Sequence, residues 1–169
     1  MLKGIDSRMT AELLDTLMRM GHGDELVLAD RNYPAHANAA ATVTPRVIEL
    51  PGFSAPEAIG LICSVLPLDA FVPAGALWMQ ADGQGDRPEP VHDEALAAIR
   101  AHLPEGGGTA SLERQAFYAH ARTAFAVVRC SEDRPYGCFI LRKGVIFRAN
   151  SASEIDPGLN EMPGATSMG

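Results

Sequence analysis

The sequence predicts an α/β fold: a single domain with a mainly parallel or mixed sheet flanked by helices. Short apolar runs typical of buried strands alternate with longer stretches in which apolar residues recur at helical spacing. The chain has 169 residues, a length that suits one domain with a sizeable core. We expect that domain to span residues 1–147. Residues 148–169 are rich in Ser, Ala, Pro and Gly without periodicity, which predicts a poorly ordered tail.

The first elements follow from capping signals and apolar runs. Ser7 is a candidate N-cap for an amphipathic helix over residues 9–20, which Gly21 ends. Short apolar runs at 25–29 and 47–50 then predict two strands, and a Pro-Gly turn closes the second.

The middle of the chain continues the alternation. A helix is expected over 54–66, because a proline suits its first turn and apolar residues follow at helical spacing. Residues 71–72 and 76–79 are expected to be extended. A Gly-rich surface loop at 82–88 then leads to a helix over 91–103.

The last elements complete the predicted sheet. A glycine run at 104–108 predicts a flexible loop, and a short helix is expected over 117–122. A strand follows over 124–129. A turn at Tyr136 and Gly137 precedes the final strand at 138–141.

Composition and charge argue against several classes of partner. The net charge is −7, and the 14 Lys and Arg residues form no block, so we expect neither nucleic acid nor an anionic membrane surface as a partner. The start of the chain has no apolar signal core and no apolar run could span a bilayer, so we expect a cytoplasmic protein. The cysteines at 63, 130 and 138 are too sparse for a disulfide framework and indicate reduced thiols.

The most informative stretch surrounds the first predicted strand. His22 lies between two glycines just before that strand, and Asp30 directly follows it. Because ligands of open α/β sheets bind at strand ends and the adjoining turns, both groups could face one pocket, which would suit proton transfer on a small polar molecule. His36 follows a Tyr-Pro turn and could line the same loop. Each also has a structural alternative: a turn histidine, a paired or solvated carboxylate, and a surface histidine.

A second candidate patch lies near the helix expected over 117–122. Arg114 lies just before that helix, where it could offer a fork of donors to sugar hydroxyls or remain a solvated surface residue. Tyr118 and Tyr136 could supply ring faces and hydroxyls to a sugar, or serve as ordinary packing.

Other kinds of site lack support in the sequence. The five histidines form no His-x-His or His-x-x-x-His pair and no Cys-x-x-Cys occurs, so we expect no metal site. Gly-x-Ser-x-Gly is absent, which leaves a serine nucleophile without its usual elbow. The glycine runs lack the flanking strand and helix of a phosphate-binding loop.

Several short segments occur in a specific order across Met1 to about Val145. They are Gly21-His-Gly-Asp24, Ala29-Asp30, Pro34-Ala-His36, Arg114 with Ala116-Phe-Tyr118, Ala124-Phe-Ala126, and Tyr136-Gly137 with Leu141-Arg-Lys-Gly144. This ordered set resembles the sugar mutarotase family of fucose mutarotase and ribose pyranase. Arg114 and the Phe-Tyr pair that follows it look closer to the fucose branch, since ribose pyranase usually has His near that position.

The resemblance implies a cofactor-free α/β enzyme that assembles into a ring-shaped homo-oligomer, commonly a decamer, with its sites at subunit contacts. Carried over residue by residue, His22 matches the family's proton-transfer histidine. Asp30 and Arg114 match positions that bind the sugar.

The resemblance also assigns a sugar contact to Tyr136, Gly137 and Cys138, which match a Tyr-Gly-Asn segment of the family. Cys138 departs from that pattern. If the family's Asn acts through its side chain, one hydrogen bond is lost here and the sugar preference changes. If it acts through its backbone, little changes.

We therefore expect cofactor-free interconversion of the anomers of a monosaccharide, with L-fucose as the first candidate. The ring would open and close with His22 as proton donor and acceptor. The alternatives are a ribose pyranase-type isomerisation, a non-catalytic monosaccharide-binding protein, and an assembly protein whose His-Asp loop is structural. Anomer exchange and sugar binding separate these functions.

Overall fold

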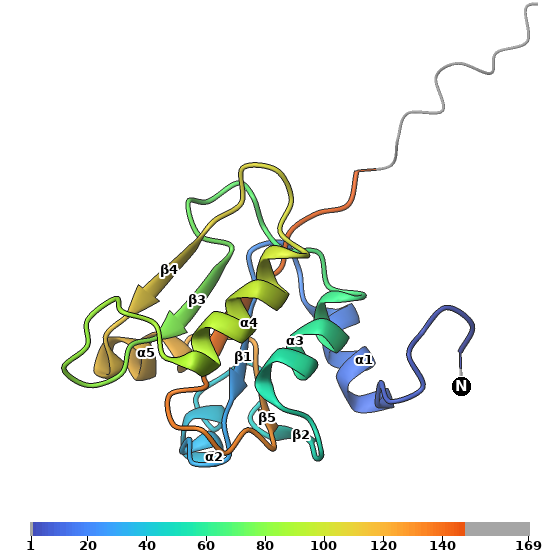
Figure 1. The fold of residues 1–169 in the computed structure, drawn as a ribbon. Helices are drawn as coiled ribbons and strands as arrows, with labels where there is room; N and C mark the ends of the chain where they lie inside the picture. The colour runs from blue at the N-terminus through green and yellow to red at the C-terminus, as the bar shows by residue number, and fades with distance from the viewer. Residues whose placement is uncertain (1, 148–169) are drawn as a thin grey trace, which may run out of the picture.

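The computed structural model describes residues 2–147, and the tail predicted at 148–169 lies outside the described residues. The described chain forms a mixed sheet between two layers of helices, which confirms the predicted fold class (Figure 1). The strands are β1 (Glu25–Ala29), β2 (Val47–Leu50), β3 (Ala76–Met79), β4 (Thr109–Leu112), β5 (Ala126–Cys130) and β6 (Phe139–Arg142). The helices are α1 (Ala11–Arg19), α2 (Ala35–Ala39), α3 (Ala55–Cys63), α4 (Pro90–Arg100) and α5 (Arg114–Ala121).

The direction of the strands gives the sheet two distinct ends. The strand order is β2-β5-β1-β6-β3-β4. β6 pairs antiparallel with β1 and β3, whereas the other pairs are parallel. Strands β1 to β5 therefore all end at one side of the sheet, where β6 begins. We call this side the carboxyl end of the sheet and the opposite side the amino end.

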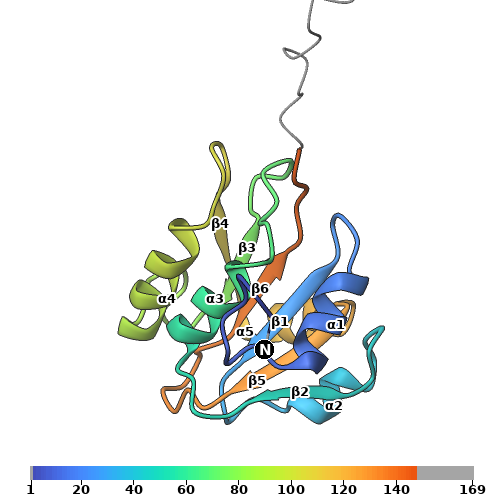
Figure 2. The ribbon, with the colours of Figure 1, turned by 90° about the vertical axis from the view of Figure 1, so that its right-hand side faces the viewer.

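Side-chain alternation along β1 divides the core between two faces. Leu26 and Leu28 pack into the core beneath α1, α3 and α4, whereas Val27 and Ala29 pack into the core beneath α2 and α5. Successive strand residues point to opposite faces, so one short strand serves both cores. Figure 1 looks onto the face covered by α3 and α4, and in the turned view of Figure 2 α4 lies to the left of the strands.

Several predicted ends were wrong. Thr10, not Ser7, caps α1, because its side chain accepts a hydrogen bond from the Leu13 N–H at 3.2 Å. Helix α3 ends at Cys63 and α4 at Arg100, each short of the predicted end. Capping geometry and tertiary packing decide such ends, and the apolar stripe alone does not reveal them.

Two elements escaped prediction, and one predicted segment is not a strand. β4 lacks the short apolar run that predicted the other strands. It forms the edge strand of the sheet because it pairs in parallel with β3. The short helix α2 follows Pro34, where only a turn was expected. Phe71 and Val72 are not in a strand: the Phe71 N–H donates to Asp69 Oδ1 at 2.9 Å, which turns the chain and leaves the Phe71 ring exposed.

Candidate functional site

A small cavity lies at the carboxyl end of the sheet. Its volume of about 150 Å³ is below the range of roughly 300–1,000 Å³ for sites that take drug-sized ligands. It brings together these residues predicted from the sequence: Asp30, Arg114, Tyr118, Tyr136 and Cys138. Its wall is completed by Asn32, Tyr33, Met79 and Pro135. Polar groups from several strand ends thus converge on a space that suits a small polar molecule.

Asp30 is fixed by the turn that follows β1. Its carboxylate is buried, and Oδ1 accepts hydrogen bonds from the N–H groups of Asn32 and Tyr33, both at 2.9 Å. Burial raises the pKa of Asp30 above its usual value, and the hydrogen bonds from Asn32, from the Cys138 thiol and from Tyr33 oppose that rise without cancelling it. The carboxyl group therefore both holds the turn and lines the cavity.

Arg114 is the first residue of α5, whose N-cap is Glu113; it does not precede the helix as predicted. Its Nε donates to Asp82 Oδ1 at 2.8 Å, and its Cζ lies 5.9 Å from the centroid of the Tyr118 ring. The hydrogen bond from Arg114 is the main cause of the lowered pKa of Asp82, to which Tyr136 also contributes. Since Asp82 engages Nε, the Nη groups are the donors that a sugar hydroxyl would meet.

Tyr136 enters the cavity wall from a strained turn. Its φ of 63° makes it the one non-glycine residue with a positive φ among residues 2–147, a conformation that costs an L-residue about 1–2 kcal/mol. At Gly137 a Cβ would lie 2.8 Å from Glu132 Cγ and 3.2 Å from Val91 Cγ2, so only glycine fits between the turn and α4. The next residue, Cys138, is buried and donates its N–H to the Tyr136 carbonyl at 2.7 Å.

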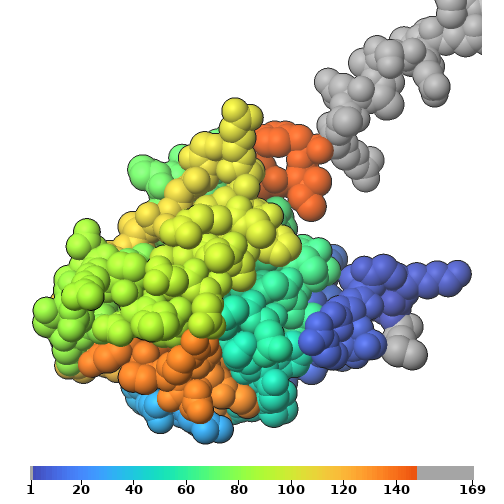
Figure 3. Space-filling view, viewed as in Figure 1, coloured from blue at the N-terminus to red at the C-terminus, as the bar shows by residue number. Residues whose placement is uncertain are grey.

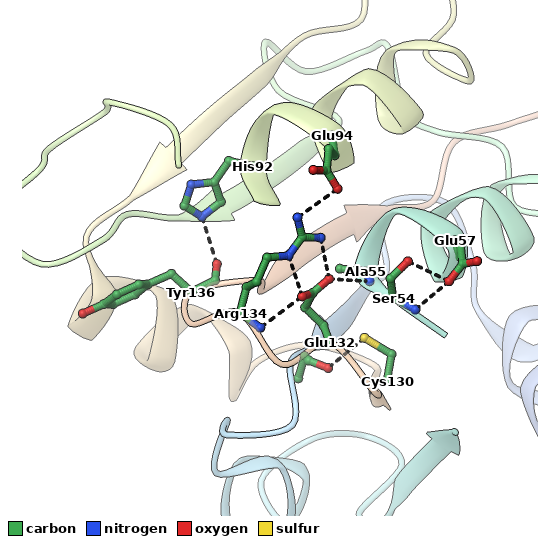
Figure 4. A network of polar contacts seen from close by, with 10 residues as sticks. Ser54, Ala55, Glu57, His92, Glu94, Cys130, Glu132, Arg134 and Tyr136 are labelled. Carbon is green, nitrogen blue, oxygen red and sulfur yellow. Dashed lines mark hydrogen bonds and ion pairs between the residues drawn. The ribbon is translucent and has the colours of Figure 1, made fainter. Parts of the chain in front are cut away.

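An ion pair holds the same turn against two helices (Figure 4). Glu132, only 2% exposed, accepts hydrogen bonds from Arg134 Nε at 2.8 Å and from the Ala55 N–H, at the start of α3, at 3.1 Å. Arg134 Nη1 reaches Glu94 on α4 at 2.9 Å. The hydrogen bonds from the Arg134 side chain lower the pKa of Glu132 to about 2. Figure 3 shows the turn, in orange, at the surface directly beside α4.

His22 lies at the amino end of the sheet, away from this cavity. Its Nε2 is 3.3 Å from Asp69 Oδ1, and its ring meets Phe71 edge-on with the centroids 5.5 Å apart. The 5 residues of β1, which span about 16 Å, separate His22 from Asp30. The structure therefore does not bring His22 and Asp30 to one pocket within a single chain, contrary to that part of the prediction.

Asp69 is the group that orients the His22 ring. Its carboxylate is buried, accepts the Phe71 N–H, and lies 3.3 Å from Arg142 Nε at the end of β6. Burial alone would raise the pKa of Asp69, but the hydrogen bonds from Phe71 and His22, together with Arg142, hold it below its usual value. An ionised carboxylate thus supports one nitrogen of an imidazole whose side chain is 47% exposed.

The other predicted residues take different places. His36 lies exposed on α2 and does not line the cavity. Gly137 shapes the turn and does not line the cavity itself. Sequence reasoning missed Asp69 and Asp82. Asp82 follows β3 at the carboxyl end of the sheet, so the strand-end rule that identified Asp30 could have found it. Asp69 meets His22 across 47 residues of sequence, for which no local signal exists.

No group of three or more His, Cys, Asp or Glu side chains that could hold a metal ion occurs within residues 2–147. No helix in the described part of the chain is long and apolar enough to cross a membrane. All three cysteines of the sequence are described, buried and free of disulfides. The Tyr33 hydroxyl is buried and has no hydrogen-bond partner among the described residues.

Comparison with known proteins places the chain in a family. Residues 3–146 match the RbsD / FucU transport protein family. An L-fucose mutarotase of Haemophilus influenzae (strain 86-028NP) is 41% identical over 146 residues, which cover 86% of this chain and 97% of the relative. The fucose mutarotase of Homo sapiens is 38% identical over 151 residues, which cover 86% and 94%.

A solved structure agrees with these relatives. The fucose mutarotase of Streptococcus pneumoniae in complex with L-fucose superposes with a TM-score of 0.75 at 34% identity, over 86% of this chain and all of the other. The family match covers most of the described residues, and the relatives align over nearly their whole length. The chain therefore belongs to the RbsD / FucU family.

Proposed function

We propose that this protein is a cofactor-free mutarotase that interconverts the anomers of a monosaccharide, with L-fucose as its substrate. The observation that carries the proposal is the cavity at the carboxyl end of the sheet, where Asp30, Arg114 and three tyrosines surround a space small enough for one sugar ring. The names of the relatives support L-fucose as the sugar.

The proposed chemistry needs only proton transfer and positioning. The anomeric hydroxyl loses a proton, the ring oxygen gains one, the ring opens, the aldehyde rotates, and the ring closes on the other face. Arg114 and Asp30 would hold sugar hydroxyls, and Tyr118 and Tyr136 would contact the ring. His22 would give and take the protons, because an imidazole has one nitrogen that can donate a proton and one that can accept it.

His22 and the cavity lie at opposite ends of one sheet, so we propose that His22 of one subunit completes the cavity of another. The surface beside His22 supports this arrangement. Phe71, Ile146 and Phe147 are all more than 60% exposed, and the Phe71 and Phe147 rings lie 6.2 Å apart. Exposed apolar groups gathered in this way favour a subunit interface. The homo-oligomer would be a closed ring, commonly a decamer in the family that the sequence resembles.

The decisive test is saturation-transfer NMR of anomeric protons with a panel of monosaccharides. We expect faster anomer exchange with L-fucose, or with D-galactose, than with D-ribose. Exchange that is fastest with D-ribose would move the protein to the ribose pyranase branch. Binding without exchange would indicate a sugar-binding module, and no binding of any monosaccharide would favour an assembly protein.

The oligomer and the location have their own tests. Light scattering should give a mass several times that of the 18.0 kDa chain. A monomer that exchanges anomers at the full rate would contradict the shared site. The cytoplasmic location stays a prediction, which fractionation of cells that express the protein would check.

A further inference from the structure

A fully buried histidine holds the backbone of Tyr136 (Figure 4). His92 lies on α4, is 0% exposed, and does not line the cavity. Its Nε2 is 2.9 Å from the Tyr136 carbonyl oxygen, and its Nδ1 accepts the N–H of Glu89 at 2.9 Å. Since a carbonyl can only accept and an N–H can only donate, both contacts together require the neutral ring with its proton on Nε2. Each ring nitrogen therefore has one defined task.

The surroundings prevent the His92 ring from turning. Its centroid lies 4.6 Å from that of Trp78 on β3 and 6.1 Å from that of Phe139 on β6, so the ring is packed between α4 and the sheet. Burial lowers the pKa of His92, although the hydrogen bond to Tyr136 opposes the shift. The neutral form that the two contacts require is therefore also the form that the environment favours.

Tyr136, which accepts the hydrogen bond from His92, has a backbone conformation that needs to be stabilised. Tyr136 has a φ of 63°, which a tyrosine rarely adopts. Its carbonyl accepts two hydrogen bonds, one from His92 and one from the Cys138 N–H. The hydrogen bond from His92 comes from α4, whereas the one from the Cys138 N–H lies within the turn itself. His92 is thus the link that ties the Tyr136 peptide to a rigid helix.

We propose that His92 is a positioning residue for sugar binding: by fixing the Tyr136 peptide in the left-handed conformation, it directs the Tyr136 side chain to the cavity wall without touching the sugar. This inference rests on the proposed function, because Tyr136 matters to sugar affinity only if the cavity binds a sugar. His92 would act on binding more than on proton transfer, since it holds a wall of the cavity and lies far from His22.

The same turn offers a matched control. Arg134 also ties the turn to α4, through Glu94, whose side chain is 56% exposed. That tie acts on the turn without contacting the Tyr136 peptide. Glu94→Gln therefore weakens one link between α4 and the turn and leaves the link through His92 intact.

The test compares three variants by anomer exchange with L-fucose. His92→Phe keeps a ring in the buried space but removes both hydrogen bonds, whereas His92→Gln can again donate from its Nε2 to the Tyr136 carbonyl. For His92→Phe we expect KM to rise about tenfold, the effect of losing the one hydrogen bond that reaches Tyr136, while kcat changes less than about threefold. His92→Gln should recover most of the loss, and Glu94→Gln should resemble the unaltered protein.

If the unaltered protein exchanges anomers, two kinetic results would overturn the proposal. One is a folded His92→Phe variant with unchanged KM, and the other is a His92→Gln variant as impaired as His92→Phe although both melt as the unaltered protein does. If His92→Phe does not fold, the KM of a folded His92→Gln variant is the test, and a KM raised about tenfold would overturn the proposal. If the unaltered protein exchanges no sugar anomers, the proposed function fails by itself. The positioning role is then read from a crystal structure of His92→Phe, in which Tyr136 should leave its positive φ and in which an unmoved Tyr136 would refute the role.

Discussion

The two ends of the sheet are built in contrasting ways. At the carboxyl end, the polar side chains around the cavity are held in place by their neighbours: Asp30 by backbone N–H groups and Arg114 by Asp82. At the amino end a single imidazole, that of His22, is half exposed and contacts the buried carboxylate of Asp69. The first end has a cavity whose wall contains no histidine, whereas the second carries His22, which can move a proton. The proposed site, assembled from both ends, would require two copies of the chain, so activity would depend on assembly.

The largest expected effect is at the amino end. His22→Ala should lower anomer exchange by about a hundredfold or more, the lower range for the loss of a general acid or base. Folding should hardly change, because the side chain is 47% exposed. Saturation-transfer NMR measures the exchange and thermal melting checks the fold. Exchange at the unaltered rate in a folded variant would remove His22 from the mechanism.

A mixing experiment tests directly whether the two ends of the sheet meet between subunits. Arg114→Ala disables the cavity and His22→Ala disables the proton donor, so each variant alone should be nearly inactive. When the two are co-expressed, about a quarter of the shared sites would combine an intact cavity with an intact His22 of the adjoining subunit, if subunits mix at random. Activity should then return to a corresponding level.

The control for mixing is the double variant that carries both substitutions in one chain. Co-expressed with either single variant, it has no pairing that restores both parts of the site, and no activity should return. If the two single variants also show no recovery although they co-purify as mixed oligomers, His22 serves a cavity of its own chain.

A third prediction concerns stability at the carboxyl end. The folded state lowers the pKa of Glu132 from 4.5 to about 2, so its ionised form contributes stability above pH 4.5, and that contribution is lost as the pH falls towards 2. Glu132→Gln should lower the free energy of unfolding by about 2 kcal/mol at neutral pH, allowing for the partly exposed partner.

The pH dependence provides the control for this stability change. In urea unfolding, the gap between Glu132→Gln and the unaltered protein should shrink steadily as the pH falls below 4.5. Glu94→Gln, at the exposed end of the same ion pair, should show a much smaller gap at every pH. A gap for Glu132→Gln that is constant with pH would assign the loss to packing and not to charge.

The smallest expected effect concerns sugar preference. Cys138 stands where the resembled family has Asn, and its buried thiol interacts with Asp30 in the cavity wall. Cys138→Asn should lower the KM for L-fucose by about threefold, the gain from one modest hydrogen bond. Cys63→Ala, in α3 and remote from the cavity, is the control. An unchanged ratio of rates across the sugar panel would mean that only the backbone of this residue matters.

The sequence predicted the parts of this molecule that local pattern determines. Strands β1, β2 and β3 were predicted at the residues where they occur, because each is a short apolar run. The rule that ligands bind at strand ends identified Asp30. It did not identify the contacts of His22 with Asp69 or of His92 with Tyr136. Those contacts join segments 47 and 44 residues apart, and only the folded chain brings them together.

The antiparallel strand β6 sets a fixed distance between the carboxyl end and the amino end of the sheet. β6 begins beside the Tyr136 turn and ends at Arg142, which contacts Asp69 beneath His22. Its register is pinned by pairs such as Leu28 with Phe139 and Glu25 with Arg142. A one-residue insertion in β6 would exchange its two faces and displace both the turn and Arg142 at once. A working variant must therefore keep the number of residues between 136 and 142. The loop at 82–88 can change in length as long as Asp82 still contacts Arg114.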